Sequence, residues 1–532
     1  MAFNLADFVE HTVDAVPDRP ALICGDRQET FAQLEERSNR LAHHLATHGV
    51  GRGDHVAVYS YNSIEFVESM LAAFKLGAVP INVNYRYVED ELVYLLDNSD
   101  AVALVVQAQF SPLVEAVHPR LPMLRHVLTV DDGSGVAPPD GSVPYEEALA
   151  AADPGRDFDP RSDDDLYILY TGGTTGYPKG VMWRHEDVWR VLGGGIDFQT
   201  GVRIEDEHQM ARLAQEGEPS VGLVLAPLMH GAAQWGTLGG LIRGTTSVLL
   251  PQFDGHAVWQ AVERYRIATL AITGDAMARP LIDALREHPY DLSSLVAIAS
   301  TAAVFSPVMK DELFDLLPNL FISEAVGSSE SGFNGMRLVE KGKTANTTGL
   351  INVARGPDTI VIGEDDRPVQ PGEVGRMARG GNVPLGYYKD PEKSAATFIT
   401  VDGKRYSVPG DSARLELDGT MTLLGRGSQC INSGGEKIYP EEVESALKGH
   451  PQVLDALVVG VPDQRWGQRV AAVVEPRPGT TPTLEELVEH CRTKVAGYKV
   501  PRQLHLVDKM PRHPSGKPDY RRASAVAEEA TP

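Results

Sequence analysis

Residues 170–180, with the sequence YTGGTTGYPKG, have the composition of a loop that binds phosphate groups. Its four glycines permit positive φ and let backbone N–H groups approach an anion closely. Its three threonines add hydroxyl donors, and Lys179 adds a mobile positive charge. The loop departs from the Walker A pattern, because Pro178 precedes the lysine and Gly180 follows it. The combination suits a triphosphate, and an ordinary hairpin with turn glycines is the alternative.

Later segments carry further residues that could act on a nucleotide. Glu330 ends the run GSSE after a predicted strand, and a carboxylate beside a triphosphate is the expected magnesium partner, although such a run could also cap a helix. Asp411 follows Pro-Gly, and Arg426 follows a glycine shortly afterwards. Taken alone, each of these short runs indicates only a turn. Lys517 ends the run PSGK, where a lysine near a C-terminus is usually just solvated.

In this order, these segments resemble the signatures of the adenylate-forming superfamily, which includes acyl-CoA synthetases, peptide-synthetase adenylation domains and luciferases. The resemblance spans essentially the whole chain. Around KGVMWR at 179–184 and GRGS at 425–428, the chain looks most like actinobacterial ligases for fatty acids and sterol side-chain acids. The resemblance implies an α/β fold: a large layered α/β adenylation domain with a β-subdomain, followed by a small mobile α+β lid.

The resemblance assigns a role to each matching residue in nucleotide chemistry. Lys517 and Glu330 would be catalytic, and Glu330 and Thr174 would bind Mg²⁺. The residues that would bind ATP or AMP are Thr171, Gly172, Gly173, Thr174, Thr175, Gly176, Lys179, Gly327, Ser328, Ser329, Asp411 and Arg426. Val326 stands where relatives carry an aromatic residue that faces adenine, so this chain lacks that ring.

The same resemblance assigns residues to the acyl group, to CoA and to a hinge. His230, Ala302 and Ala303 would border the acyl substrate, and a buried structural histidine is the alternative for His230. The residues that would bind CoA are Gly434, Gly435, Lys437 and Trp466, and packing in the core is the alternative for the tryptophan. Ser428 would be the hinge, where many relatives have Asp or Lys.

The implied reaction uses ATP and Mg²⁺, with CoA as co-substrate. The carboxylate of a hydrophobic acid, a fatty acid or a steroid side-chain acid, attacks the α-phosphate of ATP and gives acyl-AMP and pyrophosphate. The thiol of CoA then displaces AMP. Three alternatives stay open: an amide-forming ligase with an amine acceptor, a luciferase-type oxidase, and a non-catalytic acyl or nucleotide binder. The joint presence of Lys179, Glu330 and Lys517 argues against the last.

The elements around these motifs are predicted from periodicity. Short apolar strands such as residues 55–59 alternate with helices, for example a helix after residue 63 that ends at Gly77, which predicts a parallel sheet with helices on its faces. Thr30 is a predicted N-cap. Residues 199–219 are polar and are predicted to form an exposed, mobile insertion.

The second half of the chain changes character twice. Beyond residue 360, short strands with turn glycines predict a β-subdomain. Residues from Arg426 onward predict a compact α+β unit of a normal domain size, about 100 residues. We therefore expect an adenylation domain at 1–425 and a lid domain at 426–532.

Composition limits the partners of the chain. Its 532 residues are too many for one core, and a net charge of −24 disfavours nucleic acid and anionic membranes. Residues 427–532 are neutral, with 14 basic and 14 acidic side chains, and seven of the basic ones lie within 499–522, where they form a solvated face or hold an anionic nucleotide or CoA. No transmembrane segment and no secretory signal are found, and three scattered cysteines suit a reducing cytoplasm. A homodimer is the oligomer that we consider.

Overall fold

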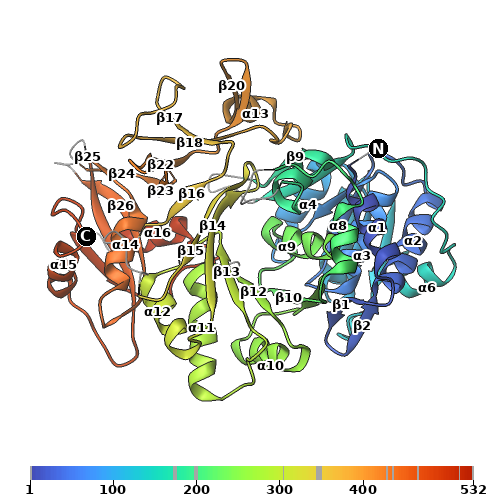
Figure 1. Cartoon of the computed structure of the whole chain (residues 1–532), viewed down its shortest axis with the longest axis horizontal. Helices are drawn as coiled ribbons and strands as arrows, with labels where there is room; N and C mark the ends of the chain where they lie inside the picture. The colour runs from blue at the N-terminus through green and yellow to red at the C-terminus, as the bar shows by residue number, and fades with distance from the viewer. Residues whose placement is uncertain are drawn as a thin grey trace. The chain divides into compact units, whose positions relative to one another are not determined.

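Five short strands form a parallel sheet in the N-terminal part of the chain (Figure 1). In the computed structural model their order is β4 (Val79–Asn82), β3 (His55–Tyr59), β5 (Ala101–Gln107), β6 (His126–Val130) and β7 (Val143–Pro144). Every neighbouring pair is parallel. The strands β3, β5 and β6 are buried at every position, as expected for a parallel sheet that is covered on both faces.

The structure describes residues 3–171, 177–196, 202–303, 305–342, 350–426, 429–433, 436–463, 467–513 and 516–529. The chain divides into two compact units. The first unit contains Met1–Ala271 and Asn382–Ile399, and the second contains Ile272–Gly381 and Thr400–Pro532.

Helices cover both faces of the parallel sheet in the first unit. On one face, alternate sheet residues pack against α2 (Phe31–Thr47), α3 (Ile64–Lys75) and α6 (Tyr145–Ala150). On the other face, the intervening residues pack against α4 (Glu89–Asn98) and α5 (Ser111–Val117). This layered arrangement confirms the sheet and helix pattern that the sequence predicts.

Local signals in this region are confirmed in detail. The hydroxyl of Thr30 accepts from the Gln33 backbone at 3.2 Å, and the Gln33 side chain accepts from the Thr30 backbone at 2.8 Å, which makes a capping box at the start of α2. The strand β3 covers the predicted residues, and α3 ends two residues before Gly77.

The first unit also contains one end of a larger sheet, which joins strands from distant parts of the chain. The order at this end is β2 (Arg27–Thr30), β1 (Pro20–Cys24), β11 (Thr246–Leu249), β10 (Val221–Val224) and β12 (Thr269–Ile272). Only the β1–β2 pair in this set is antiparallel. The helices α9 (Gly231–Ile242) and α10 (Gly255–Tyr265) follow β10 and β11 along the chain.

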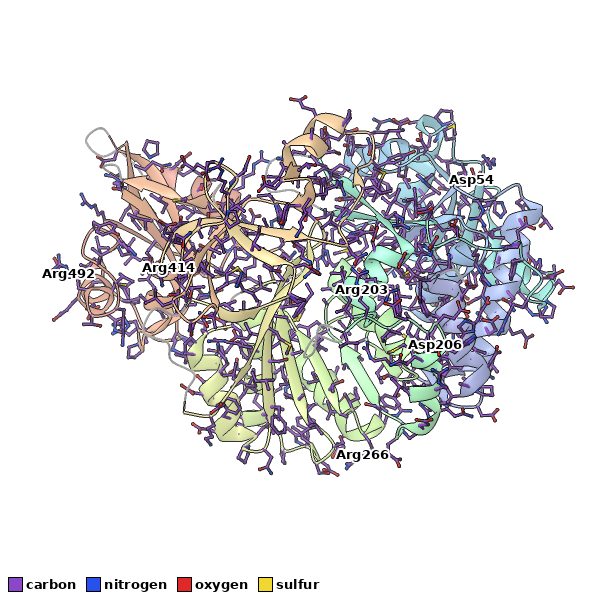
Figure 2. The ribbon with its side chains drawn as sticks, turned by 45° about the horizontal axis from the view of Figure 1, so that its top comes forward. Asp54, Arg203, Asp206, Arg266, Arg414 and Arg492 are labelled. Atoms are coloured by element: carbon purple, nitrogen blue, oxygen red, sulfur yellow. The ribbon has the colours of Figure 1, made fainter. Side chains whose placement is uncertain are left out.

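The expectation of an exposed segment across residues 199–219 is wrong for part of it. The helix α8 (Gln209–Glu216) packs against α1 (Leu5–Ala15) and buries a narrow apolar stripe formed by Met210, Ala211 and Ala214. Polar contacts hold the turn before it: Arg203 donates to Asn382 at 3.0 Å, and Arg212 donates to Asp206 at 2.5 Å. Figure 2 labels Arg203 and Asp206 in this segment.

The second unit begins with a three-stranded section that leads into a β-subdomain. The strand β13 (Ala297–Thr301) is parallel to β14 (Phe321–Ser328), which is antiparallel to β15 (Gly332–Val339). The helices α11 (Gly274–Glu287) and α12 (Pro307–Leu316) pack against one another.

The predicted β-subdomain is confirmed. Antiparallel pairing joins β16 (Asn352–Arg355), β17 (Thr359–Ile362), β18 (Val374–Gly380), β22 (Asp411–Leu415) and β23 (Met421–Arg426). Its core is formed by Val326, Val353, Val361, Met377, Ala413 and Met421. The side chain of Val326, at the position of the missing aromatic ring, is therefore part of this core.

The C-terminal part of the second unit is an α+β sandwich (Figure 1). The long hairpin of β26 (Val453–Asp463) and β27 (Gly467–Pro476) carries helices on both faces. One face packs against α14 (Pro440–Lys448) and α15 (Leu484–Arg492), and the other packs against α16 (Tyr520–Glu529). The strand β28 (Gln503–Leu506) adds to β27 in parallel.

The boundary between residues 425 and 426 falls inside the second compact unit, so it stays a prediction. Among the described residues, no helix combines the length and the apolar character that crossing a bilayer requires. The three cysteines are free thiols.

Candidate active site

The predicted phosphate loop connects two antiparallel strands of the first unit. The strand β8 (Leu166–Thr171) pairs with β9 (Lys179–Arg184), and Thr171 lies opposite Lys179 at the open end of this ladder. Residues 172–176 lie outside the described part of the chain. A hairpin and a phosphate loop are therefore not exclusive interpretations, because regular strands fix both ends of the loop.

The side chain of Lys179 is held in place while remaining about one third exposed. Its ammonium forms an ion pair with Asp390 and lies 5.7 Å from the centre of the Tyr387 ring. The short strand β19 (Gly386–Tyr387) pairs with β9, which brings both partners to the loop. The hydrogen bond from Lys179 lowers the pKa of Asp390, so this carboxylate is charged at neutral pH. An anion that enters the loop meets a positive charge that is already directed.

A buried asparagine ties the base of this loop to a second predicted site segment. The side chain of Asn82, the last residue of β4, donates to the Tyr170 carbonyl at 2.8 Å and to the Met229 carbonyl at 2.7 Å. Its oxygen accepts from the Tyr170 backbone at 2.8 Å. Because all three bonds are buried, Asn82 fixes the end of β8 relative to the residue before His230.

His230 is the N-cap residue of α9 and is half-buried. Its backbone donates to the Pro227 carbonyl at 2.9 Å. The next residue packs closely on β8, because a Cβ on Gly231 would lie 2.4 Å from a methyl carbon of Leu169 and would force that side chain to shift. The close approach of α9 to β8 places His230 and the phosphate-loop hairpin in one region of the first unit.

In the second unit, predicted residues gather at the carboxyl ends of β13 and β14. Thr301 pairs with Ala325 in this parallel ladder, so Ala302 and the segment 327–330 emerge at the same edge. Ala302 has a φ of 66° and is exposed, and Ala303 is half-buried. A non-glycine residue in this left-handed region costs on the order of 1–3 kcal/mol, and such strain concentrates at functional sites. Ligands of α/β sheets bind at this kind of edge.

The turn after β14 is fixed by hydroxyl groups. Ser328 Oγ and Ser331 Oγ lie 2.9 Å apart, and Asn334 donates to Ser331 Oγ at 2.7 Å. Ser407 donates to the backbone carbonyl of Glu330 at 2.6 Å. The turn that carries Ser329 and the half-buried Glu330 is thereby attached to the strand β21 (Lys404–Ser407).

The predicted ribose ligands lie on adjacent strands a few residues further on. Asp411 opens β22 after Gly410, which has a φ of 101°, and Asp411 pairs in register with Arg426 at the end of β23. A Cβ on Gly425 would lie 2.2 Å from a carboxylate oxygen of Glu441, so glycine is required there. The second unit therefore brings together the segments of Glu330, Asp411 and Arg426.

Lys517 stands on a short loop whose backbone is well secured. The carbonyl of Lys517 accepts from His513 at 2.8 Å, and Arg512 donates to the Gly516 carbonyl at 2.8 Å. The side chain of Lys517 is exposed. Gly516 has a φ of 78°, and a Cβ there would lie 2.9 Å from Cβ of Ala276 on α11. The loop thus contacts a helix that precedes residue 425 in the chain.

A buried charge network anchors this loop. Arg512 makes two hydrogen bonds to Asp455, at 2.6 and 2.8 Å, and Lys448 lies 3.3 Å from Asp455 and 3.5 Å from Asp275. Burial alone would raise the pKa of Asp455, but Lys448 and Arg512 lower it to about 2. Burial alone would lower the pKa of Lys448, but Asp455 and Asp275 raise it. Asp455, Lys448 and Arg512 are therefore charged near neutral pH.

Comparison with known families decides what kind of site this is. The profile described as AMP-binding enzyme matches residues 9–388, and that described as AMP-binding enzyme C-terminal domain matches residues 442–517. The chain belongs to the AMP-binding enzyme family.

Relatives within this family match the chain along its whole length. The chain is 55% identical to the 3-oxocholest-4-en-26-oate–CoA ligase of Rhodococcus rhodochrous, over 98% of this chain and 95% of the relative. It is 54% identical to the medium/long-chain-fatty-acid–CoA/3-oxocholest-4-en-26-oate–CoA ligase of Mycobacterium marinum, over 99% of this chain and 97% of the relative. A crystal structure of an anthranilate–CoA ligase in complex with anthranoyl-AMP superposes with a TM-score of 0.85 at 23% identity, covering 99% of this chain and 98% of that one. The chain thus has the adenylate-forming fold, with a large N-terminal and a small C-terminal domain.

The predicted CoA segments of this AMP-binding enzyme end on neighbouring strands. The strand β24 (Ile431–Ser433) pairs with β25 (Glu436–Ile438), and Ser433 also pairs with Gly467 of β27. The described residues that precede 434 and follow 466 therefore lie beside one another in the sheet. Of the seven basic residues in 499–522, Lys499 pairs with Glu442 at 2.6 Å and Arg512 is used by Asp455, so these two are internally neutralised.

Several predicted residues lie outside what the structure describes. Their positions or side chains are not described for Gly172, Gly173, Thr174, Thr175, Gly176, Arg426, Ser428, Gly434, Gly435, Lys437 and Trp466. Among the described ones, Thr171, Lys179 and His230 belong to the first unit. Those of the second unit are Ala302, Ala303, Gly327, Ser328, Ser329, Glu330, Asp411 and Lys517.

The structure adds residues that sequence reasoning missed in this AMP-binding enzyme. They are the groups that hold the others in place: Asn82, Asp390, Ser407, Asp455 and Arg512. A signal was available for the arginine, because it lies five residues before Lys517 in the same loop.

Proposed function

We propose that this chain is an ATP-dependent, AMP-forming acyl-CoA synthetase that activates a hydrophobic carboxylic acid, either a fatty acid or a steroid side-chain acid. One observation carries the proposal: the chain is 55% identical, over 98% of its length, to a ligase that joins 3-oxocholest-4-en-26-oate to CoA. The similarity to a ligase for medium- and long-chain fatty acids supports the wider substrate class.

In the first half-reaction, an oxygen of the carboxylate attacks the α-phosphorus of ATP and the bond to pyrophosphate breaks. Lys517 stabilises the negative charge that develops between the carboxylate and the α-phosphate. Thr171, the glycine- and threonine-rich loop and Lys179 hold the departing phosphates. Asp411 accepts from the ribose hydroxyls, and Arg426 contacts the ribose. Because Val326 is in the core, the turn at 327–329 contacts adenine through its backbone.

The donor set suits magnesium. Glu330 supplies a carboxylate on a turn that hydroxyl groups fix, and oxygen donors of this kind are the ligands that Mg²⁺ prefers. Glu330 and Thr174 would hold the ion, which offsets phosphate charge when bound.

In the second half-reaction, the sulfur of CoA attacks the acyl carbon, AMP leaves and the thiol proton is lost. We propose that residues 426–532 rotate about the region of Ser428, which removes Lys517 and admits the pantetheine arm past Gly434 and Gly435. Lys437 and Trp466 contact CoA. The pairing of Ser433 with Gly467 supports a common CoA face for both segments.

The acyl group is assigned to residues from two segments of the chain. His230 and the strained Ala302, with Ala303, border the acyl group. Both alanines have small side chains, which occupy less volume beside an acyl group than larger residues would. We further propose a cytoplasmic location, which suits the three free thiols, and a homodimer as the assembly.

An exchange experiment tests the proposal. Radioactive pyrophosphate incorporation into ATP is measured with steroid C26 acids, long-chain fatty acids, short-chain acids and aryl acids, and the product is then formed with CoA or with amines. We expect exchange with the first two classes only, and thioester formation with CoA. Exchange followed by amide formation at an equal rate would favour an amide ligase instead, and exchange with none of the acids would exclude the synthetase assignment.

A further inference from the structure

Three histidines meet at the surface of the first unit, and none of them is a residue of the candidate active site. His44 lies in the last turn of α2, His48 follows the helix as its C-cap residue, and His126 is the first residue of β6. The helix packs on the face of the parallel sheet that contains Leu128, so its C-terminal end meets the start of β6. The three side chains come from two elements that the fold fixes relative to one another.

The three imidazole rings lie close enough to share one ion. The Nε2 atoms of His44 and His126 are 2.9 Å apart. The ring centres are 4.2 Å apart for His44 and His48, 4.2 Å for His48 and His126, and 5.0 Å for His44 and His126. One ligand nitrogen from each ring can be chosen so that all three lie within 4.8 Å of one another. Two nitrogens bound to one zinc ion, each at about 2.0–2.1 Å, are separated by roughly 3 Å, so the His44–His126 distance needs little adjustment.

Hydrogen bonds set the protonation of these rings. Nδ1 of His48 lies 2.8 Å from the carbonyl oxygen of His44, which can only accept, so that nitrogen carries the proton and Nε2 keeps its lone pair. The contact between the Nε2 atoms of His44 and His126 can contain only one proton when both rings are neutral. A ring nitrogen fixed through a backbone carbonyl is the usual outer support of a metal-binding histidine.

Burial differs among the three rings in a way that suits ion uptake. His44 and His126 are each 8% exposed, whereas His48 is exposed to solvent. The two buried rings are shielded from bulk water, and the exposed ring of His48 gives an ion access to them.

A rigid link holds the two elements together beside the histidines. Arg125, which precedes His126, donates to the carbonyl of Gly49, which follows His48, at 2.7 Å. Its guanidinium also lies 3.7 Å from the carboxylate of Asp54, which is labelled in Figure 2. The guanidinium charge is thus directed to this carboxylate and carbonyl, and the backbone on both sides of the cluster is tied together.

We propose that His44, His48 and His126 form a binding site for a divalent transition-metal ion such as Zn²⁺. Three neutral nitrogens select zinc, copper or nickel over magnesium and calcium, which require oxygen ligands. The exposed side next to His48 leaves a fourth position for water, so the site would be open rather than fully enclosed by protein. The bound ion would fasten the end of α2 to the start of β6.

Two other groups of histidines and carboxylates serve as references within the described residues. They are His11 with Glu207 and His208, and His43 with Asp153 and Asp157. Each of them contains at least one exposed side chain and no pair of buried nitrogens in contact. His43 lies one position before His44 on the same helix, so its substitution is a matched control.

The test uses untagged full-length protein freed of metal with a chelator. Zn²⁺ binding is measured by calorimetry and by metal analysis after dialysis, for the wild type, His48→Gln and His43→Gln. We expect the wild type and His43→Gln to bind one zinc ion with equal affinity, unaffected by excess Mg²⁺. His48→Gln should bind it at least about tenfold more weakly, since one of three ligands is lost. Zinc should raise the Tm of the wild type but not that of His48→Gln.

Spectroscopy adds a second readout. Co²⁺ in the wild type should give visible d–d absorption that His48→Gln lacks. Equal zinc affinity of wild type and His48→Gln, absence of zinc binding to the wild type, or selective loss of binding in His43→Gln would each overturn the proposal. Because His48 is exposed, its substitution leaves the core packing of α2 intact, and unchanged circular dichroism verifies this.

Discussion

Lys179 and Lys517, the two lysines of the candidate active site, are held in opposite ways. Lys179 stands on a strand, and the contacts of its ammonium group with Asp390 and Tyr387 fix the charge itself. Lys517 stands on a loop with an exposed side chain, and the contacts of Arg512 and His513 fix the backbone beneath it. One lysine is directed through its charge and the other through its main chain.

The difference indicates two kinds of catalytic work. The ammonium group of Lys179 already faces an anion, so its position changes little when a phosphate replaces the carboxylate of Asp390. Lys179 therefore suits a permanent part of the binding loop. A charge on a secured loop moves whenever the loop moves, so Lys517 suits a group that is needed in one half-reaction and absent from the other. The predictions below test this contrast.

The largest effect is expected for Lys517→Ala. The ammonium group of Lys517 contacts the reacting carboxylate and α-phosphate most strongly in the transition state. Loss of this positive charge should therefore slow adenylation by on the order of 10³-fold. Thioester formation from supplied acyl-AMP and CoA should hardly change. Both rates are measured in single turnover, and an equal loss in both half-reactions would mean that Lys517 is not confined to the first.

Arg512→Ala tests whether the loop is positioned through its backbone. The change removes the bonds to Asp455 and to the Gly516 carbonyl, and a displacement of about 1 Å costs on the order of 10²-fold in rate. Adenylation should fall by that amount while the Michaelis constant for ATP moves little. Arg521→Ala, which removes an exposed arginine of the same domain, is the matched control. Equal rates for both variants would show that the anchor is dispensable.

Glu330→Gln addresses the magnesium ligand on a fixed turn. A neutral amide binds a hard cation less well than a carboxylate, so the Mg²⁺ concentration at half-maximal adenylation should rise about tenfold. The measurement is a magnesium titration of pyrophosphate exchange at saturating ATP. An unchanged titration curve would remove Glu330 from the ligand set.

The substitution Trp466→Ala tests whether the small domain binds CoA in addition to its role in adenylation. Loss of a stacking contact of about 1–3 kcal/mol should raise the Michaelis constant for CoA roughly tenfold and leave that for ATP unchanged. Steady-state kinetics with varied CoA give the answer. If neither constant moves, or if an amine replaces CoA at equal rate, the CoA face proposed here is wrong.

Asp390→Asn should have the smallest effect. Lys179 keeps its strand and its ring contact, and a partly exposed ion pair contributes at most about 1 kcal/mol, so the Michaelis constant for ATP should change by less than about fivefold. The change should be a decrease, because phosphate no longer competes with the carboxylate. A large loss of adenylation would show instead that the pair is needed to direct the lysine.

Local signals made much of this structure predictable from sequence. The capping box at Thr30, the strand β3 and the hairpin of the phosphate loop depend on residues within a few positions of one another. The helix α8 was missed because its apolar stripe is narrow and surrounded by charged side chains. Family resemblance supplied the site residues themselves, since a single glutamate or lysine has no local signature.

The positioning residues could not be predicted in this way. Asn82 is 88 residues from Tyr170, and Lys179 is 211 residues from Asp390. Contacts at such separations depend on how strands are ordered in a sheet. Hydrophobic periodicity predicts the type of each element but not the order of the strands. The same limit applies to the boundary at residue 425, because the segment with Asp275 packs with residues that follow it.

Lys448 contacts the carboxylates of both Asp275 and Asp455, so one of these contacts can break while the lysine keeps the other. Asp275 precedes residue 425, whereas Lys448 and Asp455 both follow it. If the C-terminal part turns away, the 3.5 Å contact between Lys448 and Asp275 separates, and the lysine departs with Asp455 still 3.3 Å away. The carboxylate of Asp275 still accepts a hydrogen bond from the backbone N–H of Ser306 at 2.7 Å, and Ser306 also precedes residue 425. The released carboxylate is then rehydrated, which offsets part of the attraction to Lys448 that is lost.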